Sequence, residues 1–249
     1  MRPAAAPLLL LPGLMCDERI WAPQRREFAG QGAIAVPGYG DARSLVEMAR
    51  RALAQAPAHF SLVGHSMGAR VALEVFRLAP ERVERLALLD TGIHLPKPNE
   101  AEKRYALRAL GVREGIGRLV DEWLPPMVHP ARRADPAFME PLRDMAMAGG
   151  VERYEAQIEA LLGRPDVLPL LGTIRCPTLI GVGRQDEWSP VEQHEAIVAM
   201  IPGAELVIFE DCGHMAPVEA PAQVNAALAR WLGRETLIPT EHEANGGRR

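Results

Sequence analysis

The sequence is poor in the features that mark disulfide-rich, nucleic-acid-binding or metal-binding proteins. It has only three cysteines, Cys16, Cys176 and Cys212, and this odd number without metal-ligand spacing favours free thiols in a reducing compartment. Lys and Arg number 28 against 32 Asp and Glu, so the net charge is −4 and no broad basic face for nucleic acid is expected. The seven histidines are scattered without ligand spacing, so we expect neither a metal nor a cofactor.

Long hydrophobic runs are also missing. The segment that precedes Cys16 imitates a lipoprotein signal, but Pro7 and Pro12 interrupt it, and Met15 stands where a small residue would precede the cleavage site. Its unbroken apolar part is only residues 8–11, whereas a membrane-spanning helix needs roughly 18 to 20 apolar residues. We interpret this segment as a buried strand, and we expect a cytoplasmic protein without a membrane partner.

The chain does contain short apolar runs that alternate with helix-compatible stretches. The runs are nearly all apolar, which is typical of strands covered on both faces of a parallel sheet. Strands are predicted at residues 7–11, 33–36, 60–63, 86–89, 178–182 and 206–209, and helices at residues 45–56, 69–78, 191–201 and 221–232. This alternation predicts an α/β fold, with a doubly wound, mostly parallel sheet formed by residues 1–94 and 172–234.

One long interval, residues 95–171, breaks the alternation and holds no convincing strand. Helix-like stretches fill it at residues 99–110, 112–124, 136–148 and 151–162, separated by Gly111, by Pro125-Pro126 and by Gly149-Gly150. Because a structureless loop of this length would be unusual, the interval predicts a helical lid over the carboxyl edge of the sheet. Periodicity is lost after Arg234, and residues 235–249 are expected to form a flexible tail.

The most informative stretch is Gly64-His65-Ser66-Met67-Gly68, which lies between a predicted strand and a predicted helix. A Gly-x-Ser-x-Gly in this context indicates a nucleophile elbow, in which the serine occupies a strained turn. Gly64 and Gly68 lack the Cβ atoms that would clash where the strand and the helix cross. The pattern is weak alone, and it gains weight from an acid and a histidine that follow in the chain.

These two partners are Asp186 and His214, each just after a predicted strand. A serine hydroxyl needs an imidazole to take its proton, and that imidazole needs a carboxylate to fix its tautomer. Because the carboxyl ends of parallel strands meet at one edge, Ser66, Asp186 and His214 are predicted to form a catalytic triad. Taken singly, each residue can also have a purely structural role: Ser66 in a turn, Asp186 as a cap and His214 as a surface histidine. Asp90, which also ends a strand, and Glu187 remain rivals for the acid.

These motifs resemble the α/β-hydrolase superfamily over about residues 7–232. They are Leu-Leu-Pro-Gly-Leu-Met-Cys-Asp with Trp21 downstream, the elbow, Cys-Pro-Thr-Leu-Ile before the acid, and Gly-His-Met-Ala-Pro-Val-Glu-Ala-Pro around the histidine. This set of motifs is similar to that of small bacterial serine esterases, including the 3-oxoadipate enol-lactonase and carrier-protein methyl esterase groups. The resemblance implies the fold and a hydrolase, and it leaves the substrate open. Many members begin with antiparallel strands that have no counterpart here, so we expect a sheet shortened at its N-terminal edge.

The oxyanion hole is where this sequence departs from the family, because Pro12-Gly13 replaces the usual His-Gly. By analogy with the family, the backbone N–H of Leu14 is expected to be one donor to the developing oxyanion. The backbone N–H of Met67, at the positive end of the helix after the nucleophile, is the other. Because backbone groups donate, Pro12 is expected to leave the hole intact.

An adaptable apolar substrate pocket is predicted from side chains that adjoin these positions or lie in the lid. The candidates are Met15, Cys16, Trp123, Met127, Trp188 and Met215. Residues 95–172 carry 11 Lys or Arg against 12 Asp or Glu, so their composition gives no sign of acidic substrates.

The leading hypothesis is a cofactor-free serine hydrolase that cleaves a small or medium carboxylic ester or lactone through an acyl-enzyme. Thioester cleavage, carbon–carbon bond hydrolysis and perhydrolysis use the same catalytic triad, so they remain alternative reactions. A non-catalytic ligand receptor on the same fold is the alternative from another class. Serine at the elbow disfavours dehalogenase and epoxide hydrolase chemistry, for which related proteins use an aspartate.

Overall fold

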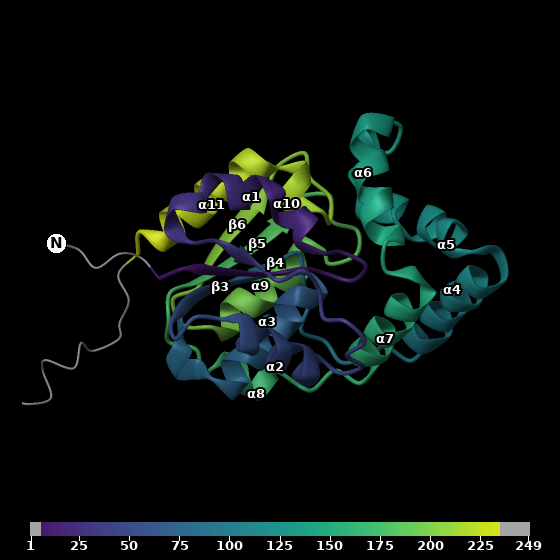
Figure 1. Ribbon diagram of the computed structural model, residues 1–249. Helices are drawn as coiled ribbons and strands as arrows, with labels where there is room; N and C mark the ends of the chain where they lie inside the picture. The colour runs from purple at the N-terminus through teal and green to yellow at the C-terminus, as the bar shows by residue number, and fades with distance from the viewer. Residues whose placement is uncertain (1–5, 235–249) are drawn as a thin grey trace, which may run out of the picture.

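The computed structural model describes residues 6–234, which build one sheet with helices on both faces (Figure 1). Its strands are β1 (Leu8–Leu11), β2 (Ile34–Ala35), β3 (Phe60–His65), β4 (Val83–Leu89), β5 (Thr178–Gly183) and β6 (Glu205–Phe209). They lie in the order β2-β1-β3-β4-β5-β6, and each is parallel to its neighbours. The predicted doubly wound parallel α/β sheet is confirmed.

The burial of the strands explains their apolar sequences. Every residue of β1, β3 and β5 is buried, as in strands that helices cover on both faces. The edge strands β2 and β6 are more exposed, and β2 has only two residues. A short edge strand leaves few unpaired backbone groups to recruit another chain.

The order of the strands reverses between β1 and β3. From β1 the chain goes outward to β2 and then returns to the other side of β1 as β3. Leu11 pairs with Gly64, so the loops that follow β1 and β3 emerge beside each other at the carboxyl edge. Ligands bind at such a switch point in open α/β sheets, which draws attention to the loops around Gly13 and Ser66.

Helices cover the two faces in separate groups (Figure 1). The first face carries α1 (Ala22–Glu27), α10 (Ala216–Glu219) and α11 (Pro221–Leu232), and the second carries α2 (Leu45–Gln55), α3 (Met67–Leu78), α8 (Leu168–Leu171) and α9 (Val191–Met200). The predicted helices correspond to α2, α3, α9 and α11. Ser44 caps the N-terminus of α2, because its side chain accepts a hydrogen bond from the Glu47 N–H at 3.2 Å.

The interval between β4 and β5 is helical and projects to one side of the sheet (Figure 1). It contains α4 (Glu100–Glu114), α5 (Ile116–Trp123), α6 (Pro136–Met147) and α7 (Gly150–Leu162), with no strand among residues 90–177.

The predicted break at Gly111 is wrong, because α4 continues through Gly111 to Glu114. The break falls instead at Gly115, whose φ of 91° lies in the region that favours glycine. Gly111 allows close packing, since a Cβ there would lie 2.7 Å from Cδ1 of Leu119 and 3.1 Å from Cγ2 of Val151. A glycine that looks like a helix breaker in the sequence is thus a packing position in the fold.

Among residues 6–234, none of the helices has the length and apolar content needed to span a bilayer. Cys16, Cys176 and Cys212 are all free thiols. The predicted tail, residues 235–249, lies outside the described residues.

Candidate active site

Ser66 lies on the sharp turn between β3 and α3. Its backbone has φ 56° and ψ −118°, a conformation that costs a non-glycine residue on the order of 1–3 kcal/mol. Hydrogen bonds from the neighbouring strand edge hold the turn in place. The Ser66 N–H donates to the Leu89 carbonyl at 2.8 Å, and the Thr91 hydroxyl donates to the Ser66 carbonyl at 3.1 Å.

The two glycines of the motif permit this turn by allowing backbones to cross. A Cβ on Gly64 would strike the Gly68 carbonyl and lie 2.6 Å from the Ala69 nitrogen. A Cβ on Gly68 would strike the Leu11 carbonyl and lie 2.6 Å from the Pro12 oxygen. The start of α3 is therefore packed directly on β3 and on the end of β1, and Ser66 projects from the carboxyl edge.

The structure brings Ser66, His214 and Asp186 into one chain of hydrogen bonds. Ser66 Oγ lies 2.8 Å from Nε2 of His214, and Nδ1 of His214 lies 2.8 Å from Oδ2 of Asp186. An ionised carboxylate only accepts, so Nδ1 carries the proton and Nε2 is left to accept from the serine hydroxyl. These three residues are separated by up to 148 positions in the chain and meet only in the fold.

Asp186 is held in its ionised form by its surroundings. Burial by itself would raise its pKa, but the charge and hydrogen bond of His214 and the backbone N–H of Ser189 outweigh burial and lower the pKa. The second carboxylate oxygen, Oδ1, accepts from the N–H groups of Trp188 at 2.9 Å and Ser189 at 2.8 Å. The carboxylate is thus fixed in both position and charge.

The two rival acids do not contact His214. Asp90 is fully buried, and its oxygens accept from the backbone N–H groups of Gly183 at 3.0 Å and Ala216 at 3.3 Å. Burial and the nearby charge of Asp186 raise the pKa of Asp90 well above its usual range. Glu187 is exposed, and its carboxylate pairs with Arg133 at 3.6 Å. Among the three acids, only Asp186 is placed to orient His214.

Two further histidines support the site, and the sequence analysis did not single them out. His65 lies 2.7 Å from the His214 carbonyl through Nε2, and burial, with the charge of His214, lowers its pKa to about 3. His194 accepts from the Thr91 N–H at 2.8 Å, and burial lowers its pKa to about 4. Both rings are therefore neutral at pH 7. The position of His65 inside the elbow motif was the one signal in the sequence.

The backbone N–H groups of Leu14 and Met67 stand next to Ser66 without protein acceptors among residues 6–234. Met67 is the first residue of α3, so its N–H has no partner within the helix. Gly13 lets the first loop approach, because a Cβ there would lie 3.1 Å from Cβ of Ser66. Leu14, Ser66 and Met67 line the same pocket.

A small apolar pocket of about 10 Å³ adjoins Ser66 and His214, with room for about one water molecule. Five of the six predicted pocket residues line it: Cys16, Trp123, Met127, Trp188 and Met215. Met15 lines neither this pocket nor the larger one described next, since it is buried in the core and its N–H donates to Oε1 of Gln157 at 2.8 Å. Burial and Asp17 raise the pKa of the Cys16 thiol to about 12, so this thiol stays protonated.

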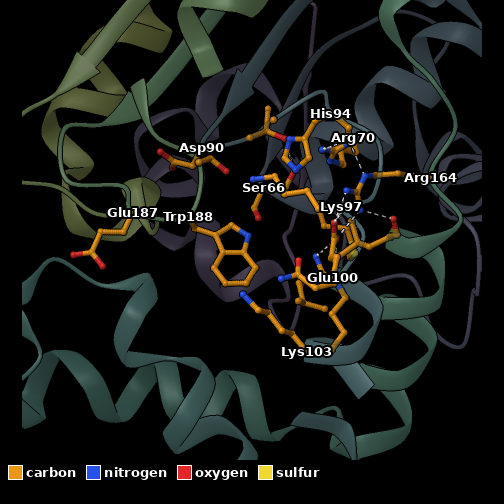
Figure 2. A pocket seen from close by; sticks show the side chains of 18 residues that line it. Ser66, Arg70, Asp90, His94, Lys97, Glu100, Lys103, Arg164, Glu187 and Trp188 are labelled. Carbon is orange, nitrogen blue, oxygen red and sulfur yellow. Dashed lines mark hydrogen bonds and ion pairs between the residues drawn. The ribbon is translucent and has the colours of Figure 1, made fainter. Parts of the chain in front are cut away.

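A second pocket of about 360 Å³ also borders Ser66, and many of its lining side chains are ionisable. Its ionisable lining residues include Arg70, Lys97, Lys103, Arg104 and Arg164 with Asp90, Glu100 and Glu187. Figure 2 shows this pocket with Ser66 near its centre and Trp188 beside it. The even charge count of residues 95–172 gave no sign of this arrangement.

A parallel sheet with a strained serine between β3 and α3 defines an enzyme of the hydrolase class. The chain belongs to the Alpha/beta hydrolase family, whose model matches residues 8–227.

Solved structures and sequence relatives agree with this family. A thermophilic esterase from Thermogutta terrifontis is 30% identical, with a TM-score of 0.83 over 92% of this chain and 89% of that chain. An enol-lactonase from Burkholderia xenovorans shares the fold at 21% identity, with a TM-score of 0.79 over 94% of each chain.

The curated relatives match at a similar level of identity to the esterase, over a smaller part of the chain. A 2-hydroxy-6-oxononadienedioate/2-hydroxy-6-oxononatrienedioate hydrolase from Escherichia coli is 29% identical over 80% of this chain and 74% of its own length. A protein of the same name from Klebsiella pneumoniae is 29% identical over 70% of this chain, and the match spans 62% of that protein's length.

Proposed function

We propose that this hydrolase cleaves a small or medium carboxylic ester or lactone through an acyl-enzyme on Ser66. The observation that carries the proposal is the hydrogen-bonded chain from Ser66 through His214 to Asp186, with 2.8 Å at both links. The 30% identity to an esterase over most of both chains supports the same reaction class.

The reaction begins when Ser66 Oγ attacks the carbonyl carbon and its proton passes to Nε2 of His214. The carbonyl oxygen becomes an oxyanion, which the N–H groups of Leu14 and Met67 stabilise. The intermediate collapses as the carbon–oxygen bond to the leaving group breaks, and His214 donates its proton to the departing alkoxide. A lactone follows the same course, except that the alcohol stays attached to the acyl chain.

Deacylation repeats these steps with water. His214 takes a proton from the water, the hydroxide attacks the acyl-enzyme, and the second oxyanion occupies the same two N–H groups. The bond to Ser66 Oγ breaks, the serine regains its proton from His214, and the carboxylic acid product leaves. Asp186 stays ionised throughout and stabilises the imidazolium that forms in each half.

The helical interval, residues 95–171, acts in this proposal as a lid on the core formed by residues 1–94 and 172–234. Trp123 from α5 lines the small pocket, and α4 and α7 contribute Lys103 and Leu161 to the large one. Side chains of the interval thus line both pockets that border Ser66. We place the enzyme in the cytoplasm, since its three cysteines are free thiols.

Carbon–carbon bond hydrolysis is the second candidate. The relatives from Escherichia coli and Klebsiella pneumoniae are hydrolases named for a compound that has a ketone and no ester. Hydrolysis next to a ketone would break a carbon–carbon bond with the same serine and histidine.

The test measures initial rates on p-nitrophenyl esters of increasing acyl length for the wild type and for Ser66→Ala. We expect a rate that falls by at least about 10³-fold in the variant, together with labelling of Ser66 by a fluorophosphonate. Labelling without turnover of any ester would favour the carbon–carbon hydrolase. A folded protein that shows neither labelling nor turnover would favour the ligand receptor and refute the proposal.

A further inference from the structure

Arg70 is a buried arginine without a carboxylate partner. It lies on α3 four residues after Ser66, one helical turn along the same face. Its residue is only 7% exposed, and its one hydrogen bond among the described residues runs from Nη2 to the His94 carbonyl at 3.2 Å. The Nε and Nη1 atoms donate to no protein atom in residues 6–234 and are not enclosed, so they open to the large pocket.

The nearest acid on this side of the pocket is committed to other arginines. Glu100 accepts from both terminal nitrogens of Arg164 at 2.7 Å and pairs with Arg104 at 2.9 Å. Because two other arginines hold Glu100, Arg70 has no carboxylate of its own within the described part of the chain. Lys97 and Lys103 line the same pocket, and the ion pairs among residues 6–234 include neither.

Two of the three acids that line the pocket, Asp90 and Glu187, lie apart from its basic residues. In the view of Figure 2, Arg70, Arg164 and Lys97 lie to the right of Ser66, and Asp90 and Glu187 lie to its left. Asp90 has a raised pKa, and Glu187 faces Arg133 at 3.6 Å, so neither acid neutralises the basic side.

Burial lowers the pKa of two groups on this side, and nearby positive charges add to the shift. Burial, with the charges of Arg70 and Arg164, lowers the pKa of His94 to about 4, so this ring is neutral at pH 7. Burial and the charge of Arg164 lower the pKa of Arg70 to about 9, which still leaves Arg70 charged at pH 7. A buried charge without a counter-ion is unfavourable, and an anion bound in the pocket would relieve it.

We propose that Arg70, with Lys97 and Lys103, binds a free carboxylate of the substrate one helical turn from Ser66. A single unpaired guanidinium matches one negative charge, and its planar fork matches the two oxygens of a carboxylate. The substrate class is therefore an ester or lactone that keeps a carboxylate a few carbon atoms from the reacting carbonyl. The assignment of the substrate as an ester or lactone rests on the proposed function for the reaction at Ser66. The binding of a carboxylate by Arg70 does not depend on it.

The experiment compares matched anionic and neutral esters. The mono-p-nitrophenyl ester of glutaric acid is set against p-nitrophenyl valerate to place the carboxylate on the acyl side. The ester 4-acetoxybenzoate is set against its methyl ester to place it on the alcohol side. In the wild type, we expect one of the two pairs to favour the anionic ester by at least about tenfold in kcat/KM.

Arg70→Met should remove most of that preference, whereas Arg70→Lys should keep part of it. The matched control is Arg118→Met, which deletes the same charge from an exposed arginine of α5 that lines neither pocket. We expect the preference to be unchanged in this control. A preference that falls equally in both variants would mean long-range charge only and would overturn the site.

A second readout does not depend on turnover. Glutarate should raise the melting temperature of Ser66→Ala and should have little effect on Ser66→Ala combined with Arg70→Met. If esters are hydrolysed at Ser66 but neither the preference nor this shift depends on Arg70, the subsite is wrong and the proposed function stands. If no ester is hydrolysed but glutarate binds through Arg70, the subsite stands and the proposed function fails. If Arg70→Met does not fold, Lys103→Met and Arg70→Lys are measured in its place. A preference for the anionic ester that is unchanged in both variants refutes the proposal.

Discussion

Nδ1 of His214 lies 2.8 Å from Oδ2 of Asp186, and the exposed fractions of the two side chains are 4% and 0%. A second buried acid at this edge, Asp90, has a histidine neighbour too, but it is His65 at 3.7 Å. Two acidic side chains thus lie near two imidazoles at one edge of the sheet. Only Asp186 and His214 share a hydrogen bond that continues to Ser66.

Asp186→Asn is expected to lower kcat for ester hydrolysis by about 10³- to 10⁴-fold, because the amide no longer fixes the imidazole tautomer. Asp90→Asn is the matched control, since it changes a buried acid that lies outside the hydrogen-bonded chain. We expect it to keep kcat within about tenfold and to lose about 1–3 kcal/mol of stability, because its amide cannot accept both backbone N–H groups. Initial rates and urea unfolding measure both effects. The reverse order of the two kcat losses would make Asp90 the acid.

Gly13→Ala should lower kcat by about 10²-fold or more with a smaller change in KM. Its Cβ would lie 3.0 Å from Nδ1 of His65 and 3.1 Å from Cβ of Ser66, so we expect the first loop to shift by a few tenths of an ångström and to move the Leu14 N–H away from the oxyanion. Gly30→Ala is the control, because a Cβ at Gly30 meets nothing within 4 Å. Steady-state kinetics of both variants check this, and a fully active Gly13→Ala would remove Leu14 from the oxyanion hole.

Trp123→Ala should shift the acyl-length preference toward longer chains. The small pocket beside His214 has a volume of about 10 Å³, so a group larger than a methyl on that side must displace Trp123 or Met127. We expect the ratio of kcat/KM for p-nitrophenyl hexanoate to that for the acetate to rise by about tenfold or more. A ratio that stays constant would place the acyl chain in the larger pocket instead.

Glu100→Gln should destabilise the protein in a pH-dependent way. Burial alone would raise the pKa of Glu100, but Arg164 and Arg104 outweigh it and lower the pKa from 4.5 to about 2. The carboxylate therefore stabilises the fold above pH 4.5, and this contribution is lost as the pH falls toward 2. At pH 7 we expect a loss of about 1–2 kcal/mol after allowing for solvent screening.

Thermal unfolding of the wild type and Glu100→Gln between pH 7 and pH 3 measures this contribution. The gap in melting temperature should narrow below pH 4.5, which is the unperturbed pKa of this carboxyl group. Glu210→Gln, which breaks the exposed pair with Arg184, should show a much smaller gap at every pH. A gap for Glu100→Gln that does not change with pH would argue against an ionised cluster at the base of the pocket.

The sequence by itself determined the sheet and the elbow. Strands such as residues 8–11 are apolar at every position, and their short length between Pro7 and Pro12 favours a strand covered on both faces over a buried helix. Gly64 and Gly68 flank Ser66 at the spacing that a tight strand-to-helix crossing requires, and they follow an apolar run and precede a helical pattern. These signals are local, because they depend on the periodicity and size of neighbouring side chains.

Only the tertiary structure decided which acid contacts His214, where α4 ends and which charges face the pocket. Asp90 and Asp186 both follow strands, but Asp186 contacts His214 at 2.8 Å, whereas Asp90 lies near His65 instead. The lid composition is balanced, yet Glu100 pairs with Arg164 and Arg104 while Arg70 of α3 is left without a carboxylate. Electrostatic interactions act through space between residues far apart in the chain, so their sum at a site cannot be read from a count along the sequence.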